Sequence, residues 1–437
     1  TMVTAGIFMV ARMSPLFELS QTALNFVLFI GATTAFWTGL IGMVQNDIKR
    51  VVAYSTLSQL GYMTVALGVS AYSAAVYHLM THAFFKALLF LAAGSVIIGM
   101  HHEQDMRKMG GLRKRMPITF WTSLVGTLAL VGTPFFAGFY SKDTIIEAAA
   151  EHAHEAHGWI ATYGYWSVLL GAFVTALYSF RLMYLTFAGK PRWHDAAPEG
   201  YVVPEADSAD HEAELAHEHE DHAHGHDDHA HEPHESPWVV TIPLILLAIP
   251  SAIIGFLTIG PMLFGTDMMG KAKQLPFFLG SIDVAPAHDA VGKLAEEFHG
   301  PLLMAWHGMA WHGWLGGPFW LALAGFLVAT VFYWWKPELH GKAREFFSLP
   351  VRILQDKYGM DTLWIRGFAG GGVQAGRASR VVDEKVIDGA IVNGSVRLID
   401  IAAGVLRTTQ SGYLYHYAFA MILGLIAMLA ALMWWWQ

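Results

Sequence analysis

The stretch AYSAAVYHLMTHAFFKALLFLAAGSVIIGM, residues 71–100, carries a lysine, Lys86, in the middle of a long apolar run. About 20 apolar residues are enough to cross a bilayer as a helix, so this stretch predicts a transmembrane helix. Lys86 lies some 14 residues from either end, about 20 Å along a helix, which is farther than a snorkelling lysine can reach. A charge at that depth costs on the order of 2.5–3.5 kcal/mol on insertion and therefore indicates a functional site.

Two histidines, His78 and His82, precede Lys86 at intervals of four residues and share its helix face. Imidazole and ammonium groups both bind and release protons, and a charge on one changes the proton affinity of the next. The stripe therefore indicates stepwise proton transfer, although either histidine alone would more often be a hydrogen-bonded core residue. A His-x3-His pair can also bind zinc, but an ammonium one turn further along would repel the ion.

The composition indicates an all-α polytopic membrane protein. Hydrophobic residues make up 54% of the 437 residues, charged residues only 14%, and the mean hydropathy is +0.39, which is too apolar for a soluble enzyme. The absence of cysteine excludes disulfides, thiol catalysis and iron–sulfur ligation by this chain. With a formal net charge of −8, the chain has no basic surface for nucleic acid.

Eight spans are expected after a partial first helix. We expect them near 22–45, 50–69, 71–100, 117–149, 159–187, 238–264, 315–335 and 415–436. Residues 1–10 are already apolar and lack the charged start of a signal peptide, so we interpret the chain as the C-terminal portion of a longer protein. The connections on one side carry 20 of the 27 Lys and Arg residues, which predicts that this side faces the cytoplasm, or the matrix in a mitochondrion.

The span at 117–149 is predicted to be a broken helix. It would be about 50 Å long as one helix, against a hydrocarbon core of roughly 30 Å. The segment VGTPFFAG, residues 131–138, interrupts it with glycine and proline, and freed backbone groups at such a break can line a wet cavity. Lys142 and Asp143 follow the break. Composition leaves open whether this pair is buried in the second half of the broken helix or caps a shorter helix outside the membrane.

Small and hydroxylic side chains in RVVAYSTLSQLGYM, residues 50–63, are typical of close helix packing. Arg181 lies six residues from the cytoplasmic end of its span, so we expect its side chain to snorkel to the interface.

Two polar regions follow. Residues 194–235 hold nine histidines between His211 and His234 among Glu and Asp, which predicts a disordered cytoplasmic loop with, at most, weak Zn, Ni or Cu binding. Residues 336–414 contain no complete span, but apolar residues repeat at intervals of three and four over 382–406. This pattern predicts an amphipathic helix lying along a surface, interrupted at Gly370–Gly372.

Four motifs together resemble the antiporter-like membrane subunits of respiratory complex I, over most of residues 1–190. They are QNDIKRVVAYSTLSQLGYM (45–63), HLMTHAFFKALLFLAAGSVI (78–97), HHEQDMRKMGGLRKRMP (101–117) and TPFFAGFYSKDTI (133–145). The resemblance implies that 1–190 form the second inverted five-helix repeat with a broken helix, and that 191–236 form the His-rich loop. It further implies two additional spans in 237–335, a lateral amphipathic helix in 336–412 and a last span in 413–437.

The resemblance also implies roles for five residues. Lys86 would be the central proton-channel residue, and His78 and His82 would connect it along the membrane midplane. Lys142 would belong to the broken helix and gate proton exit, with Asp143 beside it.

The function implied is proton translocation as a subunit of NADH:quinone oxidoreductase, with no cofactor or metal in this chain. NADH, flavin and iron–sulfur clusters would belong to partner subunits, and the expected partners are the lipid bilayer and the other membrane-arm subunits. A bacterial inner membrane is favoured over a mitochondrial one. The alternatives are a subunit of a Mrp-type multi-subunit Na⁺/H⁺ antiporter, a metal-binding protein based on the His-rich loop, and a non-transporting scaffold, which Lys86 argues against.

Overall fold

The computed structural model describes residues 2–193, 232–269, 277–278, 282, 290–310 and 317–436. Most of the predicted His-rich loop, including eight of the nine histidines between His211 and His234, lies outside the described residues. The chain divides into two compact units, Thr1–Gln355 and Asp356–Gln437, and each is described by itself.

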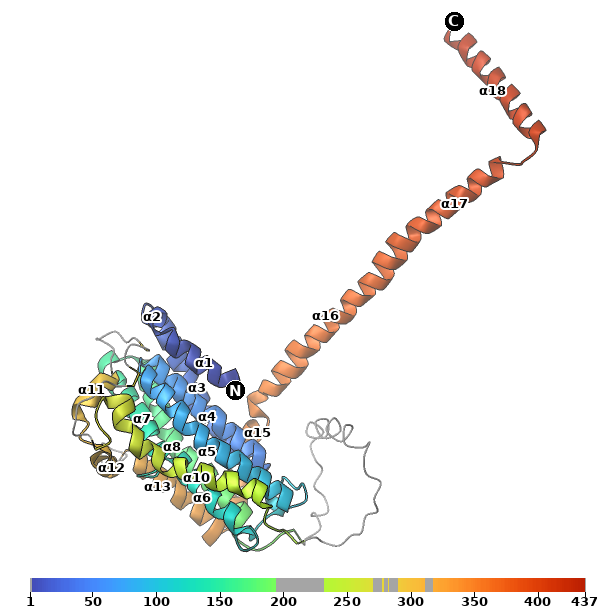
Figure 1. Ribbon diagram of the computed structural model, residues 1–437. Coiled ribbons are helices and arrows are strands. Elements are labelled where there is room, and N and C mark those ends of the chain that lie inside the picture. The colour runs from blue at the N-terminus through green and yellow to red at the C-terminus, as the bar shows by residue number, and fades with distance from the viewer. Residues whose placement is uncertain are drawn as a thin grey trace. The chain divides into compact units, whose positions relative to one another are not determined.

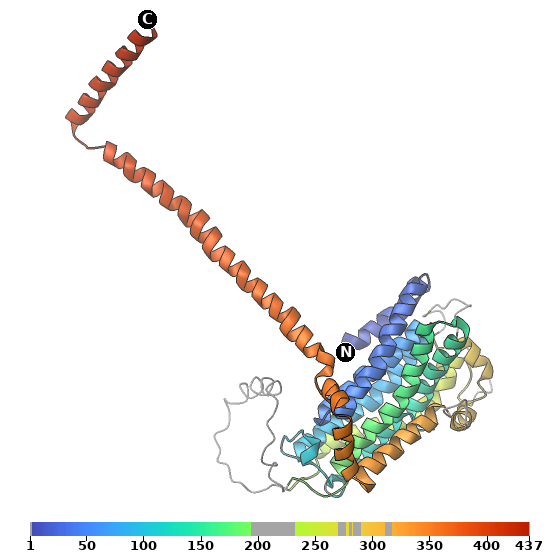
Figure 2. The same cartoon turned by 180° about the vertical axis from the view of Figure 1, so that it is seen from behind.

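The first unit is a bundle of helices (Figures 1 and 2), and every regular element in its described residues is helical. Its long helices are α3 (Gln21–Val44), α4 (Ile48–Gly68), α5 (Tyr72–Gly99), α6 (Pro117–Val131), α7 (Ala137–Ala156), α8 (Trp159–Phe187), α10 (Trp238–Ile259) and α13 (Pro318–Thr330). Its shorter helices are α1 (Met2–Arg12), α2 (Ser14–Phe17), α11 (Ala290–Glu297), α12 (Pro301–Met309), α14 (Glu338–Phe346) and α15 (Ser348–Gln355). Single turns or short irregular turns of helix are η1 (Met106–Lys108), η2 (Leu112–Lys114), η3 (Gly260–Phe264) and η5 (Val331–Trp335).

Among the described residues of both units, seven helices are long and apolar enough to cross a membrane. In the first unit these are α3, α5, α8, α10 continued by η3, and α13 continued by η5. Helix α4 is not among them, because its polar residues lower its hydropathy. Those polar residues face the interior, as described below.

Helices α3 and α4 pack closely because glycine lets their backbones approach. A Cβ atom on Gly61 of α4 would lie 2.3 Å from the backbone nitrogen of Ala35, and one on Gly31 of α3 would lie 2.6 Å from that of Val65. Small residues at such crossings are typical of membrane helices, where close van der Waals packing drives association. The prediction of close packing in this segment is therefore confirmed for Gly61, and also for Ser58, which donates a hydrogen bond to the Ala35 carbonyl at 2.6 Å.

Helices α6 and α7 are separated by a break at the VGTPFFAG segment, where the sequence predicted an interruption. Gly132 ends α6 in the left-handed conformation, with φ 84° and ψ 43°, a backbone that glycine adopts without steric cost. The first turn of α7 then lies directly against the last turn of α6, since a Cβ atom on Gly138 would come within 1.8 Å of the Ala129 carbonyl oxygen. The bilayer-length span is therefore built from two helices, and the residues after the break are buried.

Arg181 does not snorkel, so that prediction is wrong. Its side chain is buried and donates hydrogen bonds to the Gln45 carbonyl and, at 2.9 Å, to the side-chain oxygen of Asn46. The last carbonyls of a helix lack partners within the helix, and the end of α3 supplies them to this guanidinium. Arg181 therefore holds the connection between α3 and α4.

The second unit consists of a long helical segment followed by α18 (Leu414–Trp435). The long segment comprises η6 (Lys357–Gly359), η7 (Thr362–Ala369), α16 (Gly370–Val381), η8 (Val382–Val392) and α17 (Asn393–Thr409). Its 53 residues would be about 80 Å long as a helix, far more than one membrane crossing requires. The predicted interruption at Gly370–Gly372 is wrong, because Gly370 is helical, with φ −61° and ψ −40°. Glycine lowers helix stability by only about 1 kcal/mol, and the helical backbone is instead broken at Tyr358, with φ 58°.

We predict that Gly61→Ala lowers the stability of the bundle by about 1–3 kcal/mol, because the added methyl group must displace the α3 backbone. The control is Gly94→Ala on α5, where a Cβ atom meets nothing within 4 Å. Thermal unfolding of the purified full-length protein in detergent measures both variants. An equal loss of stability in both would contradict the role of Gly61 in helix packing.

Candidate functional site

Polar side chains from three neighbouring helices form a buried group inside the bundle, which we call the polar cluster. Its members are Ser55 and Gln59 from α4, His78, Thr81, His82 and Lys86 from α5, and Ser141 and Lys142 from α7. All are buried, and within the described residues they bring together four of the five residues singled out from the sequence. Buried polar groups need internal partners in a membrane, and the contacts within the cluster supply many of them.

Lys86 is 4% exposed. Its ammonium group donates a hydrogen bond to the Ser55 hydroxyl and a longer one, 3.4 Å, to the Val52 carbonyl. Both acceptors belong to α4. Lys86 therefore contacts α4 directly rather than the histidines that precede it on its own helix.

His78 has a hydrogen-bond partner at each of its two ring nitrogens. Its Nδ1 lies 2.8 Å from the Ser141 hydroxyl, and its Nε2 lies 3.2 Å from the side-chain oxygen of Gln59. The Ser141 hydroxyl is also 2.7 Å from that of Thr81. His78 thus connects α4 to α7, and the residue after Ser141 is Lys142.

His82 lies between His78 and Lys86 in the chain, and it contacts its neighbours through ring faces and edges. Its ring centroid is 5.9 Å from that of His78 and 5.3 Å from that of Phe85. Its Nε2 is buried and has no hydrogen-bond partner among the described residues. A water molecule or a side-chain movement is therefore needed to pass a proton through His82.

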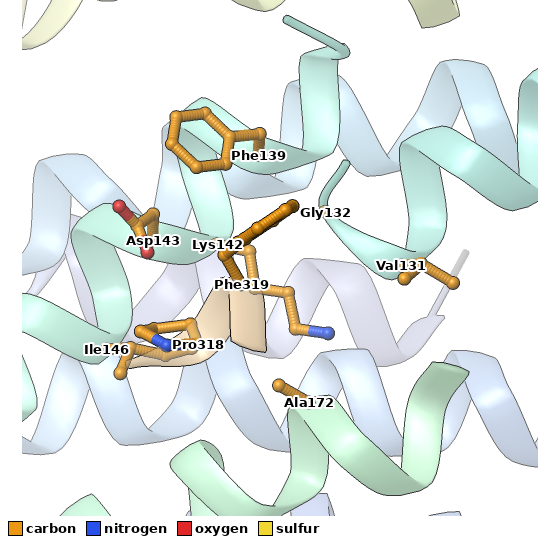
Figure 3. Close-up of a pocket in the computed structure, with 9 residues that line it drawn as sticks. All are labelled: Val131, Gly132, Phe139, Lys142, Asp143, Ile146, Ala172, Pro318 and Phe319. Carbon is orange, nitrogen blue, oxygen red and sulfur yellow. The ribbon is translucent and has the colours of Figure 1, made fainter. Parts of the chain in front are cut away.

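Lys142 is 3% exposed, and its ammonium group forms no hydrogen bond with any described residue. The nitrogen lies 4.8 Å from the centre of the Tyr62 ring, where the negative face of the aromatic ring attracts a cation. The side chain borders a cavity of about 10 Å³ at the α6–α7 break, roughly the space that one water centre occupies. Figure 3 shows the ammonium group lying between Val131 and Ala172.

Asp143 is also buried, 5% exposed, so the pair does not cap a helix outside the protein. The structure does not bring the two charged groups together. In Figure 3 the Asp143 carboxylate points away from the Lys142 ammonium, although both residues line the same cavity. It lies beside α12, because a Cβ atom on Gly308 would be 3.3 Å from a carboxylate oxygen.

The far end of α7 is tied to α11 by ion pairs. Lys293 lies 3.7 Å from a carboxylate oxygen of Glu151 and donates a hydrogen bond to Glu155. That hydrogen bond raises the pKa of Lys293 above its ordinary value. These pairs are exposed, so they contribute little to stability, but they mark where α7 emerges from the buried part of the bundle.

The polar cluster combines amines and imidazoles, which bind and release protons, with hydroxyls that connect them. No group of three or more His, Asp or Glu residues that could hold a metal ion occurs among the residues described. Sequence reasoning missed four members of the cluster: Ser55, Gln59, Thr81 and Ser141. The four-residue spacing of Ser55 and Gln59 places both on one face of α4, and this was a signal available in the sequence.

The chain was compared with known proteins. Residues 1–171 match the family model described as "NADH:quinone oxidoreductase/Mrp antiporter, TM". The chain is 49% identical to NADH-quinone oxidoreductase subunit L of Neisseria meningitidis, over 99% of the chain and 60% of that protein. It is 37% identical to NADH-ubiquinone oxidoreductase chain 5 of Marchantia polymorpha, over 100% of the chain and 57% of that protein. The chain thus spans about 60% of the length of the curated relatives it matches.

One similar solved structure is the membrane-bound sulfane sulfur reductase, an archaeal respiratory membrane complex. It has a TM-score of 0.44 and 21% sequence identity, and the match covers 94% of this chain and 56% of that chain.

We predict that a cysteine introduced at Lys142 reacts slowly with membrane-impermeant thiol reagents, because the side chain is buried. The chain has no cysteine of its own. The control is Ala156→Cys, at the exposed end of the same helix. Labelling rates in intact membranes measure the difference, and equal rates at both positions would place residue 142 outside the buried part of α7.

Proposed function

Because the chain is a homologue of subunit L and chain 5 of NADH-quinone oxidoreductases, we propose that it is a proton-translocating membrane subunit of such a complex. The observation that carries the proposal is the polar cluster itself. Two lysines and two histidines are buried together, at a broken helix, inside a multi-pass membrane protein. Ionisable groups at membrane depth are costly, and they characterise proton and ion pathways.

In this proposal Lys86 is the central proton carrier. A lysine surrounded by hydroxyl and carbonyl acceptors can hold a proton through hydrogen bonds and release it when those bonds rearrange. Its Ser55 contact ties it to α4, and His82 lies between it and His78 on α5. His78 and His82 then carry protons along the interior towards α7.

Lys142 is the proposed exit gate. Its ammonium group borders the small cavity at the α6–α7 break, where a water molecule can enter and accept a proton. Asp143 is proposed to act on the exit side, since it is buried next to Lys142 in the chain but directed towards α12. Both groups belong to α7, so a shift of α7 relative to α6 would move them together relative to the end of α6.

The proposed repeat and partners follow from the same homology. Residues 1–190 would form the second inverted five-helix repeat, 237–335 two additional spans, 336–412 a lateral amphipathic helix and 413–437 a last span. The redox groups that oxidise NADH and reduce quinone would lie in partner subunits. We place the protein in a bacterial inner membrane, in contact with the other membrane-arm subunits.

The alternative is a subunit of a Mrp-type Na⁺/H⁺ antiporter, because the description of the matching family model names both classes. Purification of the full-length protein from its native membrane separates the two. Recovery of flavin and iron–sulfur clusters with NADH dehydrogenase activity supports the oxidoreductase, whereas Na⁺-dependent proton exchange without them supports the antiporter.

We predict that Lys86→Met abolishes most proton translocation while the complex still assembles, since methionine fills similar space but cannot carry a proton. The control is Lys49→Met, at an exposed position on the first turn of α4. Proton uptake or release driven by NADH in proteoliposomes is the measurement. Full translocation by an assembled Lys86→Met complex would remove the central claim.

We predict that deleting residues 362–409 weakens retention of this subunit in the complex. Every described side chain in this segment is at least partly exposed within its unit, so we propose that its apolar residues bind neighbouring subunits or lipid. Quantitative mass spectrometry of the purified complex measures occupancy. Normal occupancy of the truncated chain would show that the helix does not brace the arm.

A further inference from the structure

Gln59 is a fully buried amide in the polar cluster whose role neither the sequence nor the homology assigns. We propose that Gln59 is a positioning residue that fixes the tautomer of His78, with the proton on Nε2 and the lone pair on Nδ1 directed at α7. The functional consequence rests on the proposed function, whereas the tautomer itself follows from hydrogen-bond geometry.

The first step is the contact between Gln59 and His78. The side-chain oxygen of Gln59 lies 3.2 Å from His78 Nε2. An amide oxygen can only accept a hydrogen bond, so Nε2 must carry the proton and donate it. In a neutral imidazole the other nitrogen, Nδ1, is then an acceptor.

The second step is the contact on the other side of the ring. Ser141 places its hydroxyl 2.8 Å from Nδ1 and donates to it, and Thr81, at 2.7 Å from Ser141, donates to the serine oxygen. The two hydroxyls and the imidazole N–H then each have one acceptor, whereas the Gln59 amide nitrogen has none among the described residues. The hydrogen bonds run from Thr81 to Ser141, from Ser141 to His78, and from His78 to Gln59.

The third step concerns what happens when His78 takes up a proton on Nδ1. The new N–H must donate, so Ser141 turns from donor to acceptor. Its own proton can turn to the Ala137 carbonyl, 3.4 Å away, and the Thr81 proton can turn to the His78 carbonyl at 3.1 Å. Both alternative acceptors are already in place, so two hydroxyl rotations accommodate the imidazolium without moving a helix.

The consequence concerns the ring nitrogen at which His78 exchanges its proton. Gln59 occupies Nε2 with an acceptor that does not itself take up the proton, so His78 gains and loses its transferable proton at Nδ1. That nitrogen faces α7, where Ser141 directly precedes Lys142. Gln59 therefore directs the proton exchange of His78 towards Ser141 and Lys142, and protons from Lys86 do not pass through Gln59.

The test measures the tautomer by magic-angle-spinning ¹⁵N NMR of the full-length protein in lipid bilayers, with ¹⁵N-labelled histidine. The His78 signals are those lost in His78→Gln. We expect the Nε2–H tautomer in the unsubstituted protein and a loss of that preference in Gln59→Met. Gln59→Glu keeps an oxygen acceptor in the same place and should retain the Nε2–H signal.

The control is Ser58→Ala, which removes a buried hydroxyl from the adjacent position but leaves Gln59 in place. This variant should keep the Nε2–H tautomer. An Nδ1–H tautomer in the unsubstituted protein would overturn the proposal, and so would equal tautomer ratios in the Met and Glu variants.

A functional readout accompanies the spectroscopy. In the assembled complex, Gln59→Met should slow proton translocation several-fold, and Gln59→Glu should restore part of the rate. Unchanged translocation in Gln59→Met would overturn the directional consequence. Because the tautomer is measured without turnover, full translocation by Lys86→Met would refute the proposed function and leave the assignment of His78 standing.

Discussion

The bundle is organised by the requirement that polar groups at membrane depth find partners within the protein. Two of the buried titratable residues, Lys86 and His78, find such partners on α4, in Ser55 and Gln59 respectively. Helix α4 can present these groups only because it lies close to α3, where Gly61 meets the Ala35 backbone. Helix α4 therefore has two roles: it packs closely against α3 through small residues, and it binds the titratable residues of α5.

Arg181 extends this principle to the end of the α3–α4 pair. A guanidinium buried against the terminal groups of α3 satisfies carbonyls that would otherwise lack partners, and it fixes the connection from which α4 begins. Asp47 caps the N-terminus of α4, because its carboxylate accepts hydrogen bonds from the backbone N–H groups of Lys49 and Arg50 at 2.7 and 3.2 Å. The polar cluster is thus supported by contacts at the connection between α3 and α4.

The sequence predicted the features that depend on composition along one helix. The stripe of His78, His82 and Lys86 and the break after residue 131 follow from periodicity, span length and the conformations that glycine and proline permit. It failed where the answer depends on another helix. Arg181 binds a carbonyl 136 residues away, and Gln59 contacts a histidine on α5, neither of which a local pattern contains. The direction of the Asp143 carboxylate could not be predicted either, because it depends on how α12 packs against α7.

The break at Gly132 also has an electrostatic consequence. Helix α6 ends there, so its last carbonyls, at the negative end of its dipole, lie at the cavity beside Lys142, and the positive end of α7 lies at the same break. The carbon chain of Lys142 approaches Gly132 closely enough that a Cβ atom there would touch it at 3.7 Å. The Lys142 ammonium group, which forms no hydrogen bond with the described residues, therefore lies near the partial negative charge of the α6 carbonyls, which acts as a fractional counter-charge. Such a counter-charge cannot be titrated away, and its strength changes only when the two half-helices move.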